Sequence, residues 1–355
     1  MNRLEKLKDA IKKANINGYL TTNVKSIYYL TGFMDISEAT LFLITPVNGD
    51  AILLVQPLSY DAANEKAEGC TVKNIGFRGK ILNKIVNEIR RSQMKSVVFD
   101  SLSTSMYLKL VQEMKEVEFK QDQDILMSLR RQKDEREIAF LIEAAKLADF
   151  GAEAGMEAIK PRIHEYEVAA EIEYAMRRRG SEGVAFETVV ASGPRSAYPH
   201  GVCSDRIINE GELVVLDLGA TYLGYRSDIT RTAVVGKPTI RQKKIFDVVL
   251  KAQEEAFKSI HAKVRASDVD GVARKIITNE GFSDFFIHSL GHGVGLDIHE
   301  APTLSPKSKE ILLEGDVVTD EPGIYIPGFG GVRIEDTVLI HKNHGEKLTK
   351  TPYSF

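Results

Sequence analysis

The chain has 355 residues, with 47 Lys plus Arg against 50 Asp plus Glu and a formal net charge of −3 at pH 7. Proteins that bind nucleic-acid phosphates usually carry a basic excess or a basic stripe, so this balance argues against a nucleic-acid partner. The hydrophobic share of 43% and the charged share of 27% exclude a disordered or fibrous chain. At roughly 100 to 200 residues per domain, we expect two domains.

The N-terminal segment predicts an amphipathic helix. Charges run through it, and Leu4, Leu7 and Ile11 recur at helical spacing, which is untypical of a signal peptide. The apolar runs fall short of the roughly 20 residues that cross a membrane. The cysteines, Cys70 and Cys203, lack the spacing of a zinc site or of a disulfide framework. We therefore expect a cytoplasmic protein with unpaired cysteines and no membrane partner.

The first 122 residues alternate helical segments with short β-branched runs, which predicts a small α/β domain. Its expected strands are 18–21, 39–45, 51–56 and 96–99. A polar stretch at 121–124 predicts a linker. The domains are therefore expected to be 1–122 and 123–355.

The second domain mixes long helices with strands. The expected helices are 134–159, 166–179, 240–260 and 268–280. Pro161 ends the first and Gly180 ends the second. Thr239 and Ser267 are the expected N-caps of the last two. The expected strands are 213–218, 229–235, 317–319 and 332–340.

Two aspartates lie on either side of a predicted hairpin in LVVLDLGATYLGYRSDITRTAVV. If Tyr222 and Leu223 form the turn, Asp217 lies directly opposite Asp228. A longer loop would shift this register, because Tyr-Leu is not a preferred two-residue turn. Facing like charges destabilise a sheet, so the pair calls for a neutralising cation. Taken alone, two capping or solvent-facing aspartates are an equally good interpretation.

Two glutamates repeat the pattern in VVTDEPGIYIPGFGGVRIEDTVLI, where Glu321 and Glu335 lie symmetrically about Gly328. Glycine and proline mark the turn between them. Each of the two predicted strand pairs therefore presents a couple of carboxylates.

Three histidines lie between these hairpins in HSLGHGVGLDIHEAP, at His288, His292 and His299. The intervening glycines permit close approach of a ligand or a strand, but their spacing is not that of a nucleotide-binding loop. An imidazole and four carboxylates form an oxygen-rich set suited to two divalent metals. We expect His288 to be structural, and the neighbouring Asp297 and Asp320 to be surface or supporting groups.

These motifs resemble the pita-bread metallopeptidases, in particular the Xaa-Pro dipeptidases (prolidases) and Xaa-Pro aminopeptidases (aminopeptidases P). The matching blocks are ASGPRSAYPHG, LDLGATYLGYRSDITRT, HSLGHGVGLDIHE and EPGIYIPGFGGVRIED, and NVKSIYYLTGF resembles the start of the family's smaller domain. The resemblance implies an α/β (α+β) fold, with a creatinase/prolidase-type N-terminal domain followed by a pita-bread catalytic domain. It also implies a homodimer.

The resemblance assigns roles to individual residues. The implied metal ligands are Asp217, Asp228, His292, Glu321 and Glu335. Of these, Asp228 and Glu335 would bridge two divalent ions, which could be Mn, Co or Zn. The implied substrate-binding residues are His200, His299 and Arg333, and the implied catalytic residues are His200, His299 and Glu321.

The family's activity implies hydrolysis of the Xaa-Pro bond of dipeptides by a hydroxide that bridges the two metal ions. Prolidases commonly carry an arginine shortly after the His-Glu pair, which grips the dipeptide's carboxylate. Here the run is HEAPT, with Thr303 at that place. An Xaa-Pro aminopeptidase that acts on longer peptides with proline second therefore stays an alternative.

Three further relatives fit the sequence less well. A creatinase-like hydrolase works without this metal set, and methionine aminopeptidases usually lack the extra N-terminal domain. Non-catalytic peptide-binding relatives have lost ligands, whereas every ligand type is present in this chain.

Overall fold

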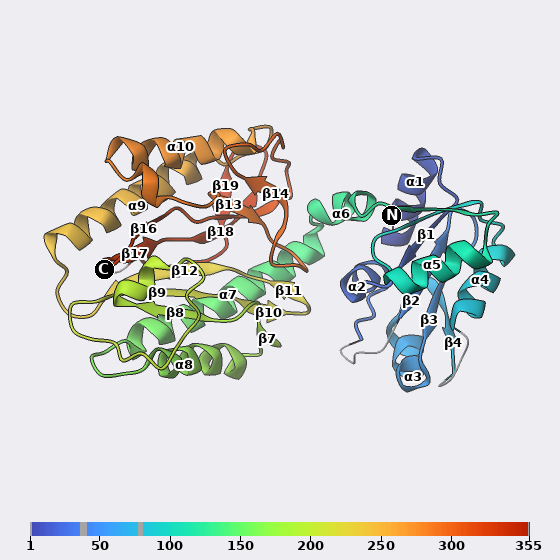
Figure 1. Ribbon diagram of the computed structural model, residues 1–355, viewed down its shortest axis with the longest axis horizontal. Helices are drawn as coiled ribbons and strands as arrows, with labels where there is room; N and C mark the ends of the chain where they lie inside the picture. Colours follow the sequence, from blue (N-terminus) through green and yellow to red (C-terminus); the bar gives the residue numbers. More distant parts are fainter. Residues whose placement is uncertain (1, 36–40, 77–80, 354) are drawn as a thin grey trace. The chain divides into compact units, whose positions relative to one another are not determined.

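The computed structural model describes residues 2–35, 41–76, 81–353 and 355 (Figure 1). The chain divides into two compact units, residues 1–130 and 131–355. The division falls within α6 (Asp124–Arg131), the helix that follows the polar stretch expected as the linker. The domain limits expected from the sequence, 1–122 and 123–355, stay a prediction.

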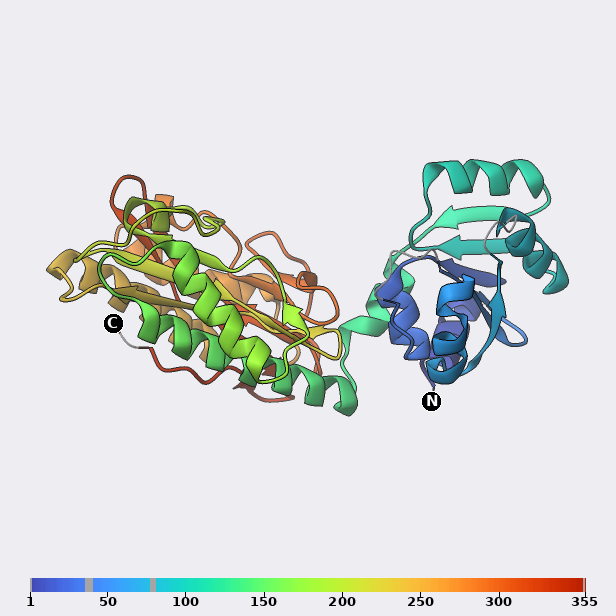
Figure 2. The ribbon, with the colours of Figure 1, turned by 90° about the horizontal axis from the view of Figure 1, so that it is seen from below.

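The described part of the N-terminal unit contains a six-stranded sheet with helices on both faces (Figure 2). The strand order is β4-β3-β2-β1-β5-β6, and β2 runs antiparallel to both of its neighbours. The strands are β1 (Gly18–Thr21), β2 (Phe42–Pro46), β3 (Ala51–Val55), β4 (Cys70–Asn74), β5 (Ser96–Phe99) and β6 (Glu118–Gln121). The helices are α1 (Arg3–Lys13), α2 (Val24–Thr31), α3 (Pro57–Lys66), α4 (Ile81–Arg91) and α5 (Thr104–Glu113).

The elements expected for this unit are confirmed with small shifts at their ends. Leu4, Leu7 and Ile11 are buried along α1, as the helical spacing predicts. The strands expected at 18–21 and 96–99 are β1 and β5. The strand expected at 39–45 is β2, and its first two expected residues lie outside the described residues.

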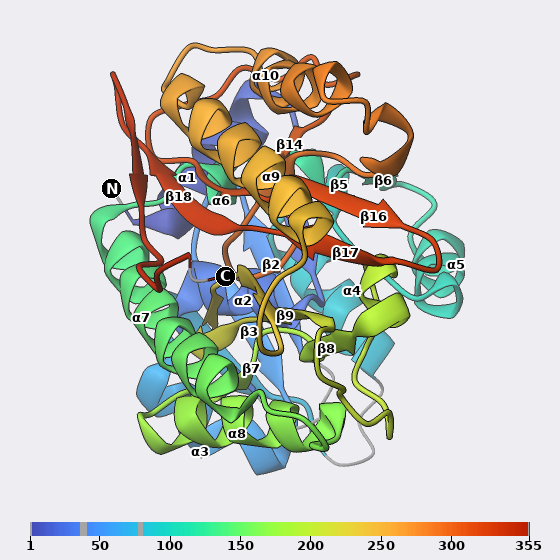
Figure 3. The same ribbon diagram turned by 90° about the vertical axis from the view of Figure 1, so that its left-hand side faces the viewer.

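The C-terminal unit consists of two halves, each with a pair of helices packed against strands (Figure 3). The first half contains α7 (Glu135–Ala158), α8 (Glu165–Arg178), β7 (Gly183–Val184), β8 (Val189–Ser192), η1 (Gly193–Ala197), β9 (Leu213–Leu218), β10 (Ala220–Tyr222), β11 (Tyr225–Arg226) and β12 (Ile229–Val234). The second contains α9 (Ile240–Ser259), α10 (Ala266–Asn279), η2 (Ser283–Phe285), β13 (Gly291–Gly293), β14 (Glu300–Leu304), β15 (Val317–Asp320), β16 (Gly323–Ile326), β17 (Gly330–Arg333), β18 (Asp336–Ile340) and β19 (Gly345–Lys347).

Each half has its own hydrophobic core. In the first, Leu147 and Ile172 from the helices pack with Leu216 of β9. In the second, Val249 and Ile277 from the helices share a core with strand residues of β15 to β18. The halves meet where Thr230 of β12 pairs with Glu335, which brings the ends of strands from both halves together.

The helices of this unit follow their sequence signals. A capping box of Asp134 and Glu137 begins α7, and Thr239 caps α9 as expected. The helix expected from 268 begins earlier, at Ala266, because the amide of Ala266 donates to the carbonyl of Glu310 at 2.9 Å and needs no capping side chain. The expected N-cap role of Ser267 is therefore wrong. No described helix is long and apolar enough to span a membrane.

The conditional register of the first hairpin is wrong. Tyr222 pairs with Tyr225, so the turn is Leu223–Gly224, and both turn residues have positive φ, at 46° and 78°. This conformation matches the twist of the flanking strands. Asp217 consequently lies opposite Thr230 rather than Asp228.

The strand expected at 332–340 is two strands, β17 and β18. The ladder is interrupted at Glu335, whose amide donates to the carbonyl of Thr230 at 3.1 Å in the other half. The interruption thus turns Glu335 toward β12.

The hairpin turn predicts a stabilising substitution. Leu223 is 40% exposed and holds a left-handed conformation that costs a leucine about 1 kcal/mol or more, whereas asparagine tolerates it better. We expect Leu223→Asn to raise the thermal unfolding midpoint of the C-terminal unit. Gly224→Ala in the same turn should lower it, and a lower midpoint for Leu223→Asn would contradict the interpretation.

Candidate metal centre

Two aspartates come from the first half. Asp217 lies in β9, and its Oδ2 accepts a hydrogen bond from Nη2 of Arg333 at 2.5 Å. Asp228 directly precedes β12 and is buried. The Thr337 hydroxyl fixes the backbone of Asp228, accepting from its amide at 3.3 Å and donating to its carbonyl at 2.7 Å. Asp228 lies two positions before Thr230, the direct cross-strand partner of Asp217, and residues two apart on a strand project from the same face. The corrected register therefore still brings both carboxylates to one face.

His292 lies in β13 with its ring oriented by the backbone. Its Nδ1 is 3.0 Å from the carbonyl oxygen of Gly293, so Nδ1 carries the proton and Nε2 keeps its lone pair. Burial lowers the pKa of His292, which favours the neutral ring. Nε2 lies 3.3 Å from Oε1 of Glu321 and 3.7 Å from Oδ2 of Asp228. An unprotonated nitrogen that faces two carboxylate oxygens is an arrangement suited to a cation.

The two glutamates come from the second hairpin of the second half. The pairs β15–β18 and β16–β17 share one register, in which Glu321 and Glu335 lie opposite each other about Gly328, as the sequence predicts. Oε1 of Glu321 accepts from the Thr319 hydroxyl at 2.9 Å. Oε2 of Glu335 accepts from the Thr230 hydroxyl at 2.6 Å. A threonine therefore orients each glutamate.

The charges of these groups act on one another in a buried space. Asp228, His292 and Glu335 each offer a ligand atom within 4.8 Å of the other two. Burial raises the pKa of Asp228 well above its usual value, and the charges of Glu335 and Asp217 add to the rise. Burial likewise raises the pKa of Glu335, with the charges of Glu321 and Asp217 adding, and burial raises the pKa of Glu321. The charge of Arg333 opposes these rises, but a single guanidinium does not neutralise four carboxylates.

The unsatisfied atoms of the cluster fit a divalent cation. Oδ1 of Asp217 and Oε1 of Glu335 are buried and accept no hydrogen bond from the described residues. A buried carboxylate oxygen without a partner is costly unless a proton or a cation neutralises it. Together with Nε2 of His292, these oxygens form the mixed nitrogen and oxygen donor set that Mn, Co, Zn and Fe accept.

Arg333 connects the carboxylates to a buried chain of hydrogen bonds. Its Nη1 donates to the Tyr325 hydroxyl at 2.8 Å, while its Nη2 holds Asp217. The Tyr325 oxygen lies 2.9 Å from Nε2 of His288, whose Nδ1 lies 2.7 Å from the carbonyl oxygen of Ser289. Nδ1 of His288 therefore donates to the backbone and Nε2 accepts from the tyrosine. Both nitrogens are engaged, which fits the structural role expected for His288.

The two remaining predicted histidines lie toward solvent. The ring of His299 packs edge-on against that of His292, with 4.3 Å between the ring centroids. His200 is exposed in the loop that follows η1. Burial lowers the pKa of His299, and the charges of His292 and His200 lower it further. His299 is therefore favoured in its neutral form, beside the carboxylates.

Sequence reasoning missed the threonines and the tyrosine that support the ligands. Thr230 lies two residues after Asp228, and Thr319 lies two residues before Glu321. Strand residues two apart share a face, so the alternation alone could have indicated both threonines. Nothing in the local pattern distinguishes Tyr325 from an ordinary core residue.

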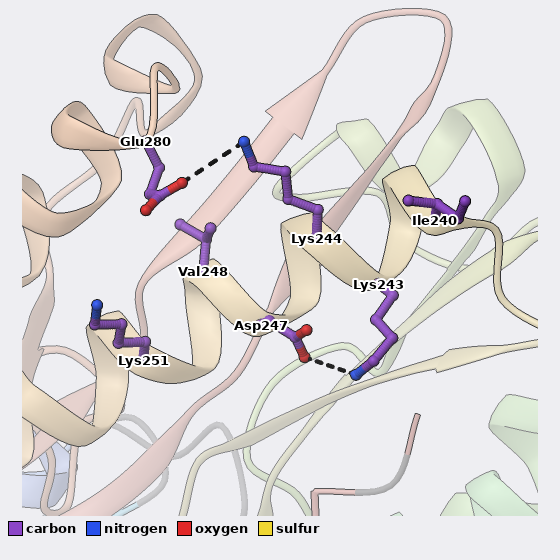
Figure 4. Close-up of a pocket in the computed structure, with 7 residues that line it drawn as sticks. All are labelled: Ile240, Lys243, Lys244, Asp247, Val248, Lys251 and Glu280. Carbon is purple, nitrogen blue, oxygen red and sulfur yellow. Dashed lines mark hydrogen bonds and ion pairs between the residues drawn. The ribbon is translucent and has the colours of Figure 1, made fainter.

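A groove of about 480 Å³ lies along α9 (Figure 4). In its lining, Lys244 pairs with Glu280 at 3.6 Å and Lys243 pairs with Asp247 at 3.0 Å. Of the described residues that line it, none is a predicted site residue. The groove therefore does not compete with the carboxylate cluster as a catalytic site.

Known proteins match the chain over its whole length. Residues 139–342 match Metallopeptidase family M24, and residues 3–132 match the Creatinase/Prolidase N-terminal domain. A protein named Xaa-Pro dipeptidase from Pyrococcus furiosus is 42% identical over 98% of both chains. The solved Xaa-Pro dipeptidase from Bacillus anthracis has a TM-score of 0.94 at 37% identity, covering 99% of this chain and 98% of that one. An X-Pro aminopeptidase from Thermotoga maritima has a TM-score of 0.91 at 33% identity, covering 100% and 99%.

The fold and the cluster define a metallopeptidase with a pita-bread catalytic domain, which confirms the fold expected from the sequence. The chain belongs to metallopeptidase family M24, and a creatinase/prolidase N-terminal domain precedes its catalytic domain. Membership in this family implies the use of divalent metal, in agreement with the donor set.

Metal binding should stabilise the protein more strongly at higher pH. A raised carboxyl pKa means that the folded metal-free state binds protons more readily than the unfolded chain, so stability falls as pH rises through the pKa values of Asp228 and Glu335. A divalent cation competes with these protons, so its affinity rises with pH. We expect Mn(II) or Co(II), added after chelator treatment, to raise the thermal unfolding midpoint more at pH 8 than at pH 6.

A pair of matched variants controls for nonspecific metal binding. Asp228→Asn should lose most of the metal-induced rise, whereas Asp247→Asn, on the exposed side of α9, should keep it. An equal rise in both variants would contradict metal binding at the cluster.

Proposed function

We propose that this protein is a prolidase, a metallopeptidase that hydrolyses the Xaa-Pro bond of dipeptides. The observation that carries the proposal is the gathering of ligand atoms of Asp228, His292 and Glu335 within 4.8 Å of one another, where Oε1 of Glu335 is buried and has no hydrogen-bond partner among the described residues. The full-length relationship to a protein named Xaa-Pro dipeptidase supports the substrate class.

The metal ligands in this proposal come from both halves of the catalytic domain. They would be Asp217, Asp228, His292, Glu321 and Glu335, and they would hold two ions of Mn, Co or Zn. When bound, such ions would lower the pKa of a water to about 7 and so supply a hydroxide nucleophile at neutral pH. Cleavage of an amide releases an amine, so the departing proline nitrogen must gain a proton.

The chain's own residues bind the peptide and move that proton. His299, whose ring packs against that of His292, and His200 bind the substrate and stabilise the oxyanion. Glu321 carries the proton to the leaving nitrogen, a role that suits a carboxyl whose pKa burial raises. Arg333 contributes to substrate binding by holding Asp217 and the Tyr325 hydroxyl in place.

Thr303 favours a second candidate function, an Xaa-Pro aminopeptidase that accepts longer peptides. Thr303 lies directly opposite His292 in the β13–β14 ladder, so its side chain projects from the same face as the imidazole. A threonine there carries no charge to grip the C-terminal carboxylate of a dipeptide. The similarity to an X-Pro aminopeptidase from Thermotoga maritima is compatible with this alternative.

The proposal extends to location and assembly. We expect a cytoplasmic homodimer, and the two free cysteines, Cys70 and Cys203, suit a reducing compartment. Sedimentation of the purified protein would measure its mass in solution.

Loss of a shared ligand should abolish proline release. We expect Asp228→Ala or Glu335→Ala to lower kcat on an Xaa-Pro dipeptide by roughly a thousandfold or more, because each removes a carboxylate that would hold the metal. Chelator treatment of the unmodified enzyme should stop proline release, and added Mn(II) or Co(II) should restore it. Asp247→Asn serves as the control, and full activity in either alanine variant would refute the ligand assignment.

The substrate length can be tested at Thr303. We expect Thr303→Arg to raise kcat/KM for Xaa-Pro relative to Xaa-Pro-Xaa about tenfold, because a guanidinium forms a strong bidentate pair with a carboxylate. Thr303→Met, of similar length but uncharged, is the control. If unmodified enzyme already cleaves Xaa-Pro-Xaa faster than Xaa-Pro, the aminopeptidase is the better assignment.

A further inference from the structure

The loop that carries His200 is closed at both ends by one buried carboxylate. Glu165, the first residue of α8, is 0% exposed. Its Oε1 accepts from the amide and the hydroxyl of Ser192, at 2.8 Å each. Its Oε2 accepts from the amide and the hydroxyl of Ser204, at 3.0 Å and 2.7 Å. Ser192 ends β8 and Ser204 follows the loop, so Glu165 draws the two ends of the segment together.

A guanidinium adds to this anchor. Nη1 of Arg195, within the same segment, donates to Oε2 of Glu165. A carboxylate is costly to bury unless its oxygens are paired, and here a cation and four neutral donors satisfy it. The carboxylate of Glu165 is therefore satisfied by donors from residues 192–204.

The backbone on each side of His200 is bound by an arginine, and only one of the two arginines belongs to the anchor. Nη2 of Arg195 donates to the carbonyl of Val202 at 2.7 Å. On the other side, the carbonyl of Pro199 accepts from Nη1 of Arg333 at 3.3 Å. His200 thus stands between two carbonyls that are tied to arginines, one leading to Glu165 and the other to the metal centre.

Glu165 is not needed to begin its own helix. The side chain of Glu167 accepts from the amide of His164 at 2.8 Å, and together these two residues form the capping box of α8. All of the side-chain contacts of Glu165 described above go to the segment 192–204. Its effect is therefore directed at the loop rather than at the helix.

We propose that Glu165 is a positioning residue for substrate binding, which fixes, through Arg195, the backbone on which His200 stands. Among the described residues, the side chain of Glu165 contacts Ser192, Arg195 and Ser204, so it acts on the reaction through the placement of the imidazole. The inference rests on the substrate-binding role proposed above for His200.

A double-mutant cycle with His200 tests the inference. Glu165→Gln keeps the shape but replaces an acceptor oxygen with an NH₂ group that confronts other donors. On an Xaa-Pro dipeptide we expect it to lower kcat/KM about tenfold, mainly through a higher KM, and to lower it less than about twofold in a His200→Ala background. The metal content of the protein should be unchanged by Glu165→Gln in both backgrounds.

Glu167→Gln, an exposed position on the same helix, is the matched control and should leave KM unchanged. If Glu165→Gln does not fold, Arg195→Met takes its place in the cycle, because it removes the link to Val202 at a side chain that is 26% exposed. We expect Arg195→Met likewise to lower kcat/KM when His200 is present and to lower it much less in the His200→Ala background.

The possible failures are distinguishable. Equal losses of kcat/KM in both backgrounds, or no loss in either, would overturn the inference while leaving the role of His200 intact. Undiminished kcat/KM and KM in His200→Ala alone would refute the substrate role of His200 and the inference with it. Neither result would bear on the metal ligands, which are tested separately by the Asp228 and Glu335 variants.

Discussion

The confinement of four carboxylates in a buried space is the constraint on which the catalytic unit depends. Like charges in a low-dielectric environment repel strongly, so the surrounding structure must hold them in place until a cation neutralises them. Threonine hydroxyls orient Glu321 and Glu335, and Arg333 supplies a positive charge to Asp217. The helices that back each half keep the strands fixed through separate hydrophobic cores. Part of the free energy of folding therefore offsets a repulsion that bound protons or a metal cation relieve.

Much of this arrangement could be predicted from sequence. The symmetry of Glu321 and Glu335 about Gly328 was predictable because glycine and proline mark the turn, and the observed register agrees. The helix beginnings at Asp134 and Thr239 follow from capping side chains close in sequence. These features depend on residues that are close together in the sequence.

The misses arose where distant segments decide the structure. The register of Asp217 is the exception, because that miss is local: the turn is Leu223–Gly224 rather than Tyr222–Leu223, and both of its residues have positive φ. The start of α10 is set by the carbonyl of Glu310, and the end of β17 by Thr230. None of these partners is recognisable from the sequence of the element that it shapes.

Buried acids outside the metal centre support the loops that carry its histidines. Besides Glu165, Glu300 next to His299 is paired with Lys133 at 3.3 Å, and the two side chains are 2% and 1% exposed. Removing one partner of such a pair leaves a buried charge unmatched, which is strongly destabilising. Ion pairs therefore hold the segments that carry His200 and His299, while both of these histidines remain exposed.

The pairing of Thr230 with Glu335 also affects how the enzyme is made. The two residues are 105 positions apart, so Glu335 is synthesised well after Thr230. During synthesis, domains fold as the ribosome releases them, N-terminal parts first. The half that carries Asp217 and Asp228 therefore emerges before Glu335, and the cluster is complete only when the segment of Glu335 pairs with Thr230. A nascent chain cannot cut peptides before that segment has been synthesised.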